Sequence, residues 1–179
     1  TSESQAFLTI ARALEMIAPE DGDAITINLT EGTFSPSITG EEFSIVMISN
    51  VNLIGQGEEV TIIDAEQTDR VITMENCQDN IISDLTITGG LAEGVYPDNG
   101  GGGMFLSISN PTLTHVTISG NTANDYAGGM LLFISNPTLT HVTISGNMGA
   151  DGGGMRLSTS NPTLTHVTIV NNTAEYGGG

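Results

Sequence analysis

The segment 109–121, SNPTLTHVTISGN, decides the fold of this chain because it occurs three times. It returns unchanged at 135–147 and as SNPTLTHVTIVNN at 160–172, so successive copies begin 26 and 25 residues apart. A GGM triplet recurs with the same steps, at 102–104, 128–130 and 153–155. Repeats of 20–50 residues are the signature of a solenoid, in which each repeat stacks on the next.

The residues of each repeat favour short strands over helices. Thr, Val, Ile and Ser dominate, and Gly and Asn-Pro interrupt them at close intervals. In the first copy we expect strands at 102–107, 110–114 and 116–119. Apolar residues alternate within each, but Leu113 and Val116 are three apart, which predicts a corner at His115. The sequence therefore predicts an all-β fold, a parallel β-helix with three short strands per 25–26-residue coil.

Stacking one coil on the next places like residues in columns along the axis, about 4.8 Å apart. We expect inward columns headed by Met104, Leu113 and Ile118. Asparagine side chains in columns can pair along the axis and satisfy buried polar groups at the corners. Two such columns are predicted: Asn121, Asn147 and Asn172, and Asn110, Asn136 and Asn161.

We interpret the chain as one continuous solenoid with three parts. Residues 1–20 hold apolar residues at helical spacing, which predicts a short N-terminal α-helix capping the first coil. Residues 21–100 form irregular coils, and 101–179 the regular repeats. The chain stops at AEYGGG, where another strand is expected. We therefore expect a truncated array, or end-to-end association through an uncapped last coil.

Composition excludes several kinds of partner. The 179 residues include 21 acidic residues, three Arg and no Lys, giving a formal net charge of −18. Such a chain cannot neutralise phosphates, so we expect no binding to nucleic acid or to anionic membranes. No apolar run is long enough to insert into a bilayer. Cys77 is the single cysteine and cannot form an internal disulfide.

Several motifs resemble a known superfamily. The segments 11–34 (ARALEMIAPEDGDAITINLTEGTF), NLIGQG at 52–57 and TIID at 61–64 resemble the start of pectate-lyase-like domains. The NPTLTHVTISGN…GGGM unit is similar to repeats of bacterial secreted and surface proteins of the polymorphic outer-membrane protein type. The resemblance implies a right-handed helix and an extracellular or cell-surface location in bacteria. The superfamily contains lyases, hydrolases and adhesins, and more often carries Asn at the corner held here by His115.

Two sets of residues are candidate metal ligands. His115, His141 and His166 form one column, but a straight column spreads its nitrogens along a line instead of converging them on zinc, so we interpret them as stacked corner residues. Acidic residues precede the glycines of successive loops and would be brought together by stacking. With the loop carbonyls they are candidates for Ca²⁺, the alternative being solvated loops; they are Asp98, Asp125, Asp151 and Glu175.

Outward threonines predict a regular surface. Spaced about 6.7 Å by 4.8 Å, they would resemble the ice-binding face of some β-solenoids, although Thr is also simply a favoured exposed strand residue. The candidates are Thr112, Thr114, Thr138, Thr140, Thr163 and Thr165.

Three functions therefore stand. We favour a non-catalytic extracellular module, structural or adhesin-like, in a larger bacterial protein, with extracellular polysaccharide or a cell surface as partner. The alternative is a fragment of a carbohydrate-active enzyme, a polysaccharide lyase or glycoside hydrolase, with its site near the irregular coils or the insert LAEGVYPDNG at 91–100. No catalytic residue is assigned, since the chain lacks Lys and its three Arg lie far apart. Ice binding is the third.

Overall fold

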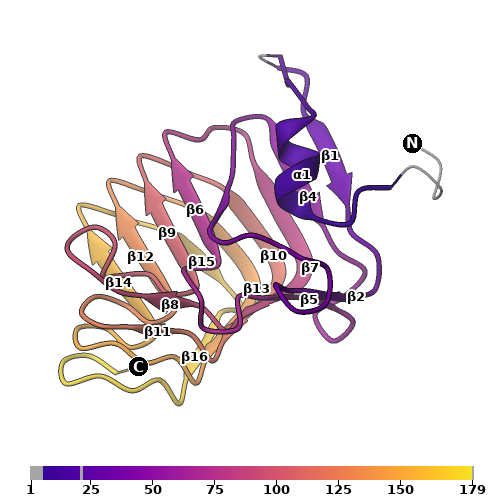
Figure 1. The fold of residues 1–179 in the computed structure, drawn as a ribbon. Helices are drawn as coiled ribbons and strands as arrows, with labels where there is room; N and C mark the ends of the chain where they lie inside the picture. Colours follow the sequence, from indigo (N-terminus) through magenta and orange to yellow (C-terminus); the bar gives the residue numbers. More distant parts are fainter. Residues whose placement is uncertain (1–5, 21, 179) are drawn as a thin grey trace.

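The computed structural model describes residues 6–20 and 22–178 and shows a parallel β-helix of about six turns (Figure 1). The coils follow one another along a single axis, and one hydrophobic core runs from Ile10 near the N-terminus to Ile144 in the fifth coil. In the described part of the chain, no helix is long and apolar enough to span a membrane. The all-β architecture predicted from the repeats is therefore confirmed.

The N-terminal helix α1 (Ile10–Glu15) packs on the first coils. Thr9 caps it, its Oγ1 accepting from the backbone N–H of Arg12 at 3.2 Å. Ile10 and Leu14 are buried, as the helical spacing predicted. The helix is shorter than segment 1–20, of which residues 1–5 lie outside the described part. A groove of about 810 Å³ separates it from the first coil, so it covers that coil only in part.

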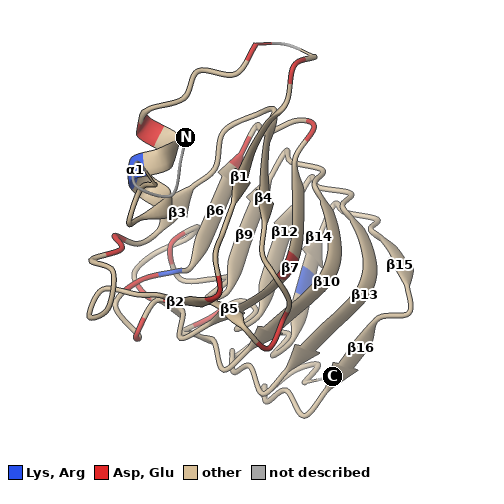
Figure 2. Cartoon of the chain, turned by 90° about the vertical axis from the view of Figure 1, so that its right-hand side faces the viewer, with Lys and Arg blue, Asp and Glu red and all other residues tan. Residues whose placement is uncertain are grey.

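The larger sheet holds nine strands, all parallel. Its main path adds one strand per coil in chain order, as Figure 2 shows: β1 (Ile25–Asn28), β4 (Val51–Ile54), β7 (Ile81–Thr88), β10 (Thr112–Ser119), β13 (Thr138–Ser145) and β15 (Thr163–Thr165). Three shorter strands extend it: β2 (Gly32–Phe34), β5 (Thr61–Asp64) and β16 (Thr168–Val170). The step of one strand per coil is what the 25–26-residue period predicts.

A second, five-stranded sheet faces another direction. Its order along the axis is β3 (Ile45–Val46), β6 (Ile72–Glu75), β9 (Met104–Ser107), β12 (Met130–Phe133) and β14 (Met155–Ser158). The pair β8 (Leu91–Ala92) and β11 (Thr122–Ala123) forms a third, small sheet that the sequence did not predict. The two glycines of each GGM triplet stand directly before β9, β12 and β14. Glycine is required there because the coils approach closely: a Cβ on Gly103 would lie 2.7 Å from the carbonyl oxygen of Gly129 in the next coil.

The inward columns are in the predicted register. Met130 pairs with Met104 and Met155, and the leucine and isoleucine columns pair in the same way. Leu113 and Ile118 are fully buried, and burying such a side chain stabilises the fold by about 1.5–3 kcal/mol. In the last described coil, Leu164 is 47% exposed. End-to-end association through that coil stays a prediction.

The predicted corner at His115 is present but does not end a strand. His115 has a φ of 51°, a left-handed conformation, and the register resumes on either side of it. The segments predicted as two strands therefore form the single bent strand β10, and likewise β13. Only in the last coil are they separate, as β15 and β16. His141 and His166 have the same conformation, and so does Asp84, which fills this position in β7.

The first asparagine column is a buried ladder. Nδ2 of Asn121 donates to Oδ1 of Asn147 at 3.0 Å, and Nδ2 of Asn147 donates to Oδ1 of Asn172 at 3.0 Å. Each Nδ2 also donates to a carbonyl of the preceding coil. The second column is exposed, and its predicted amide pairing is wrong: the backbone N–H of Asn136 donates to Oδ1 of Asn110 at 2.6 Å instead.

Candidate functional site

The outer face of the five-stranded sheet carries a cluster of aromatic side chains, which we call the aromatic platform: Tyr96, Phe105, Tyr126 and Phe133. In β9 and β12 the core side chains are Met104, Leu106, Met130 and Leu132. The alternating residues Phe105, Leu131 and Phe133 therefore point outward. Phe105 is nevertheless 2% exposed and Leu131 fully buried. Residues of the cover loop (93–101) and of the segment 124–128 pack over them.

Two tyrosines form the solvent side of the aromatic platform. Tyr96 meets Tyr126 edge to face, with ring centroids 6.1 Å apart and planes at 79°. It meets Phe133 in the same way at 6.4 Å and 77°. Tyr96 is 50% exposed, so aromatic surface remains available to a ligand while its neighbours hold the ring in place.

Arg70 anchors the cover loop to the sheet. Its Nη2 donates to the carbonyl oxygens of Pro97 and Gly100 at 2.9 and 2.8 Å, and its Cζ lies 4.9 Å from the ring centroid of Phe105. Burial lowers the pKa of Arg70, and Asp98 is the first of the acidic neighbours that oppose this. Arg70 therefore holds the cover loop against the five-stranded sheet.

Arg156 supports the platform from β14. Its guanidinium lies 4.1 Å from the ring centroid of Tyr126, and Nε donates to Oδ2 of Asp151 at 2.8 Å. Both side chains are part-exposed, so this pair contributes little stability by itself. Its effect is to cover one face of the Tyr126 ring and hold the ring in place.

The four predicted calcium ligands are not equivalent in the stack. Tyr126 bridges to Asp151, and Asp151 to Tyr176. Asp151 therefore stands one position away from the column of Asp125 and Glu175, and it points to Arg156 instead. The expectation that stacking brings all four carboxylates together is wrong.

The other acidic groups have different partners. Oδ2 of Asp125 accepts from Nδ2 of Asn99 at 3.1 Å. The negative charge of Asp98 stabilises the charged form of Arg70 and so opposes the lowering of the Arg70 pKa by burial. Across the described ranges, no group of three or more His, Cys, Asp or Glu side chains is arranged to hold a metal ion. Calcium binding stays a prediction without an assembled site.

The histidine column stacks as predicted. The ring centroids of His115 and His141 are 5.0 Å apart, and those of His141 and His166 are 4.7 Å apart, with planes at 17° in both pairs. Asp84 continues the column, its Oδ1 lying 3.6 Å from Nδ1 of His115. Near-parallel rings spread their nitrogens along the axis, so this geometry fits corner residues better than a metal centre.

The threonine columns are also in register. Thr112 pairs with Thr138 and Thr138 with Thr163, while Thr114, Thr140 and Thr165 align beside them. A further column outside the predicted set follows the bend: Thr86, Thr117, Thr143 and Thr168. Because the chain turns at the histidines, the columns do not all share one plane. Ice binding stays a prediction.

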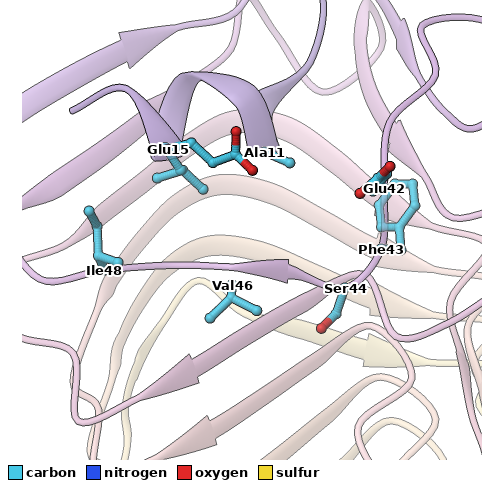
Figure 3. A pocket seen from close by; sticks show the side chains of 8 residues that line it. Ala11, Glu15, Glu42, Phe43, Ser44, Val46 and Ile48 are labelled. Carbon is cyan, nitrogen blue, oxygen red and sulfur yellow. The ribbon is translucent and has the colours of Figure 1, made fainter.

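A groove lies at the β3 end of the five-stranded sheet, away from the aromatic platform. It has a volume of about 370 Å³ and separates α1 from β3, with Ala11 and Glu15 on the helix, Val46 on the strand and Ile48 just after it (Figure 3). Glu15 already accepts from Nη1 of Arg12 at 2.7 Å. Glu42 reaches the groove from the segment before β3.

Sequence reasoning named the insert 91–100 as a place for a site but missed the aromatic platform beside it. The available signal was MFLS at 104–107 and MLLF at 130–133, where apolar residues fill outward as well as inward positions. The corresponding strands of the larger sheet place Thr outward. Continuous apolar character in a strand indicates burial on both faces.

These observations agree with comparisons to known proteins. A family model described as right handed beta helix region matches residues 37–179. The chain belongs to this family. A model described as a protein of unknown function, DUF1565, matches residues 1–60, and no curated protein matches the chain.

Two solved structures are similar to this chain, and the first of them shares its fold. A mutant pectin methylesterase in complex with a hexasaccharide aligns with a TM-score of 0.52 and 13% identity, over 86% of this chain and 57% of that one. Another pectin methylesterase–hexasaccharide complex aligns with a TM-score of 0.49 and 15% identity, over 97% of this chain and 65% of that one. The chain thus spans little more than half the length of the first of these carbohydrate-active enzymes. At such identities the likeness shows the fold alone.

Proposed function

We propose that this β-helix is a non-catalytic module of a bacterial secreted or cell-surface protein, and that its aromatic platform binds extracellular polysaccharide. The exposed Tyr96, held edge to face by two further rings, is the observation that carries the proposal. Sugar rings present C–H groups that pack on aromatic faces, and a few fixed polar groups then orient the chain.

The setting of the platform supports binding. Two of its rings, Phe105 and Phe133, lie on the neighbouring strands β9 and β12, which are about 4.8 Å apart along the helix axis. The regular coils that continue on either side give a polymer further rigid surface to follow. The pectin methylesterase of known structure holds a hexasaccharide, and we take from it only that this fold can present a surface to a sugar chain.

Binding without chemistry is supported by the engagement of three charged groups beneath the exposed ring of Tyr96. Asp151 is paired with Arg156, Asp125 with Asn99, and the donors of Arg70 with loop carbonyls. A general acid or base must be within reach of the atom it protonates or deprotonates. These groups instead hold the protein's own loops.

The test is a glycan array with wild-type protein and Tyr96→Ala. Tyr176→Ala is the matched control, since Tyr176 is also exposed but lies in the last coil and outside the platform. We expect polysaccharide binding that falls at least tenfold in Tyr96→Ala and stays unchanged in the control. Assays for esterase, lyase and glycosidase activity run in parallel. Turnover of a bound glycan would overturn the non-catalytic assignment in favour of the enzyme alternative.

A further inference from the structure

The aromatic platform is surrounded by negative charge. The acidic residues on its elements and on the chain that meets Arg70 are Asp69, Glu75, Glu93, Asp98, Asp125 and Asp151. Glu93 and Asp98 are exposed and stand on either side of Tyr96 in the cover loop. Figure 2 shows that acidic residues lie mainly in the loops between the strands.

Little positive charge is available to hold an anionic sugar at this face. The chain contains no lysine. Of its three arginines, Arg70 is 6% exposed and donates to loop carbonyls, and Arg12 pairs with Glu15 on α1. Arg156 is part-exposed, and its charge is offset by Asp151, to which its Nε donates. A uronic acid would lose its hydration here and meet only this already paired cation in return.

The same arrangement suits a cation. An ammonium group over the exposed face of a tyrosine is attracted by the ring quadrupole, and a nearby carboxylate adds Coulomb attraction. Tyr96 supplies the ring, and Glu93 and Asp98 supply carboxylates from the same loop. Glu93 and Asp98 lie three and two residues from Tyr96 in this loop, and all three side chains are exposed.

We propose that the ligand of the aromatic platform is an amine-bearing polysaccharide, one built from unacetylated amino sugars, and that uronic-acid polymers are excluded. This rests on the proposed function, which supplies the platform as a glycan site. The new element is the charge of the sugar, which the proposed function leaves open.

Four hexasaccharides test the charge preference by calorimetry at about pH 6, where amines and carboxylates are both charged. Hexaglucosamine, its fully N-acetylated form and cellohexaose share one β-1,4 backbone and differ in the group at C2. Hexagalacturonate supplies the anionic case. We expect hexaglucosamine to bind at least tenfold more tightly than cellohexaose at low salt. The advantage should shrink in about 0.5 M salt, where screening is strong.

Variants separate local charge from the overall charge of −18. Glu93→Gln/Asp98→Asn should remove most of the preference for hexaglucosamine. Glu31→Gln/Glu59→Gln neutralises two exposed acids in the loops before β2 and before β5, outside the platform, and should leave the preference unchanged. Equal losses in both double variants would assign the preference to bulk charge and overturn the inference.

The outcomes distinguish the two proposals. Tightest binding to hexagalacturonate, or equal binding to all four sugars, would overturn the amine preference and leave the glycan platform standing. If none of the four sugars binds to correctly folded protein, and the array is also blank, the proposed function itself fails. Circular dichroism and thermal unfolding of each variant confirm that its fold is intact.

Discussion

Replacing Asn147 by alanine tests the contribution of the buried asparagine ladder. Asn147 is 1% exposed, and its Oδ1 accepts from both the backbone N–H and Nδ2 of Asn121 at 3.0 Å. Its Nδ2 donates to the carbonyl of Ile118 at 2.9 Å and to Asn172. Alanine removes the acceptor of the buried N–H of Asn121 and the side-chain donor to Ile118, while Nδ2 of Asn121 keeps its bond to the carbonyl of Ile87.

Each buried polar group left without a partner costs about 1–3 kcal/mol, so Asn147→Ala should destabilise the protein by about 2–5 kcal/mol. For a domain of this size that lowers the melting temperature by about 4–20 °C. The matched control is Asn136→Ala, because Asn136 belongs to the exposed column and its Oδ1 serves one backbone N–H that water can also reach. We expect the control to cost under about 1 kcal/mol.

The assay is thermal and urea unfolding followed by circular dichroism in the strand region. Similar losses of stability in Asn147→Ala and Asn136→Ala would refute the reasoning, because they would show that burial of the ladder does not set its contribution.

Three further predictions concern the corner, the cap and the cover loop. His141→Val places a β-branched residue at a φ of 53° and should lower the free energy of unfolding by about 1–3 kcal/mol, measured with urea. Thr143→Val, in the same strand, should leave it nearly unchanged, and equal losses in the two variants would refute a conformational role for the corner. Glu41 is buried, accepts from two N–H groups of α1, and has a pKa raised above 4.5 chiefly by burial. The folded protein therefore holds the Glu41 proton more tightly than the unfolded chain does, so the stability from Glu41 is fully present below pH 4.5 and declines as the pH rises through the folded pKa. Unfolding free energies measured over a pH series should show this decline in wild type and not in Glu41→Ala. Parallel pH dependences in the two proteins would contradict the prediction. Arg70→Met should release the cover loop (93–101), so that a protease cleaves it at least tenfold faster than in wild type. An unchanged cleavage rate would show that Arg70 does not hold the loop in place.

The sequence predicted those parts of the fold that depend on repetition. Identical residues at fixed spacing must stack on their copies, so the register of Met104 with Met130 followed from counting alone. The break in alternation at His115 predicted the bend, because period-2 alternation cannot continue through a left-handed residue. That the strand continues through this bend depends on hydrogen bonds to neighbouring coils, which a single repeat does not reveal.

The candidate site was harder to predict because it is made where repetition fails. Tyr96 lies in an insert without a counterpart in later coils, and its contacts with Tyr126 and Phe133 join residues up to 37 positions apart. The acids before the glycines drift in their offset from the next strand, and Asp151 accordingly moved out of the column. Spacing identifies columns when loops have equal length, and these loops do not.

Disulfide formation between neighbouring coils tests the stacking most directly. Thr117 and Thr143 are partners in the register of β10 and β13, and adjacent strands place Cα atoms about 4.8 Å apart, within disulfide range. Thr117→Cys/Thr143→Cys should therefore cross-link readily under mild oxidation. Thr117→Cys/Ser145→Cys, two residues out of register and about 8 Å apart, should not. Efficient cross-linking of the offset pair, with none of the in-register pair, would contradict the coil-upon-coil arrangement from which the platform, the asparagine ladder and the histidine column follow.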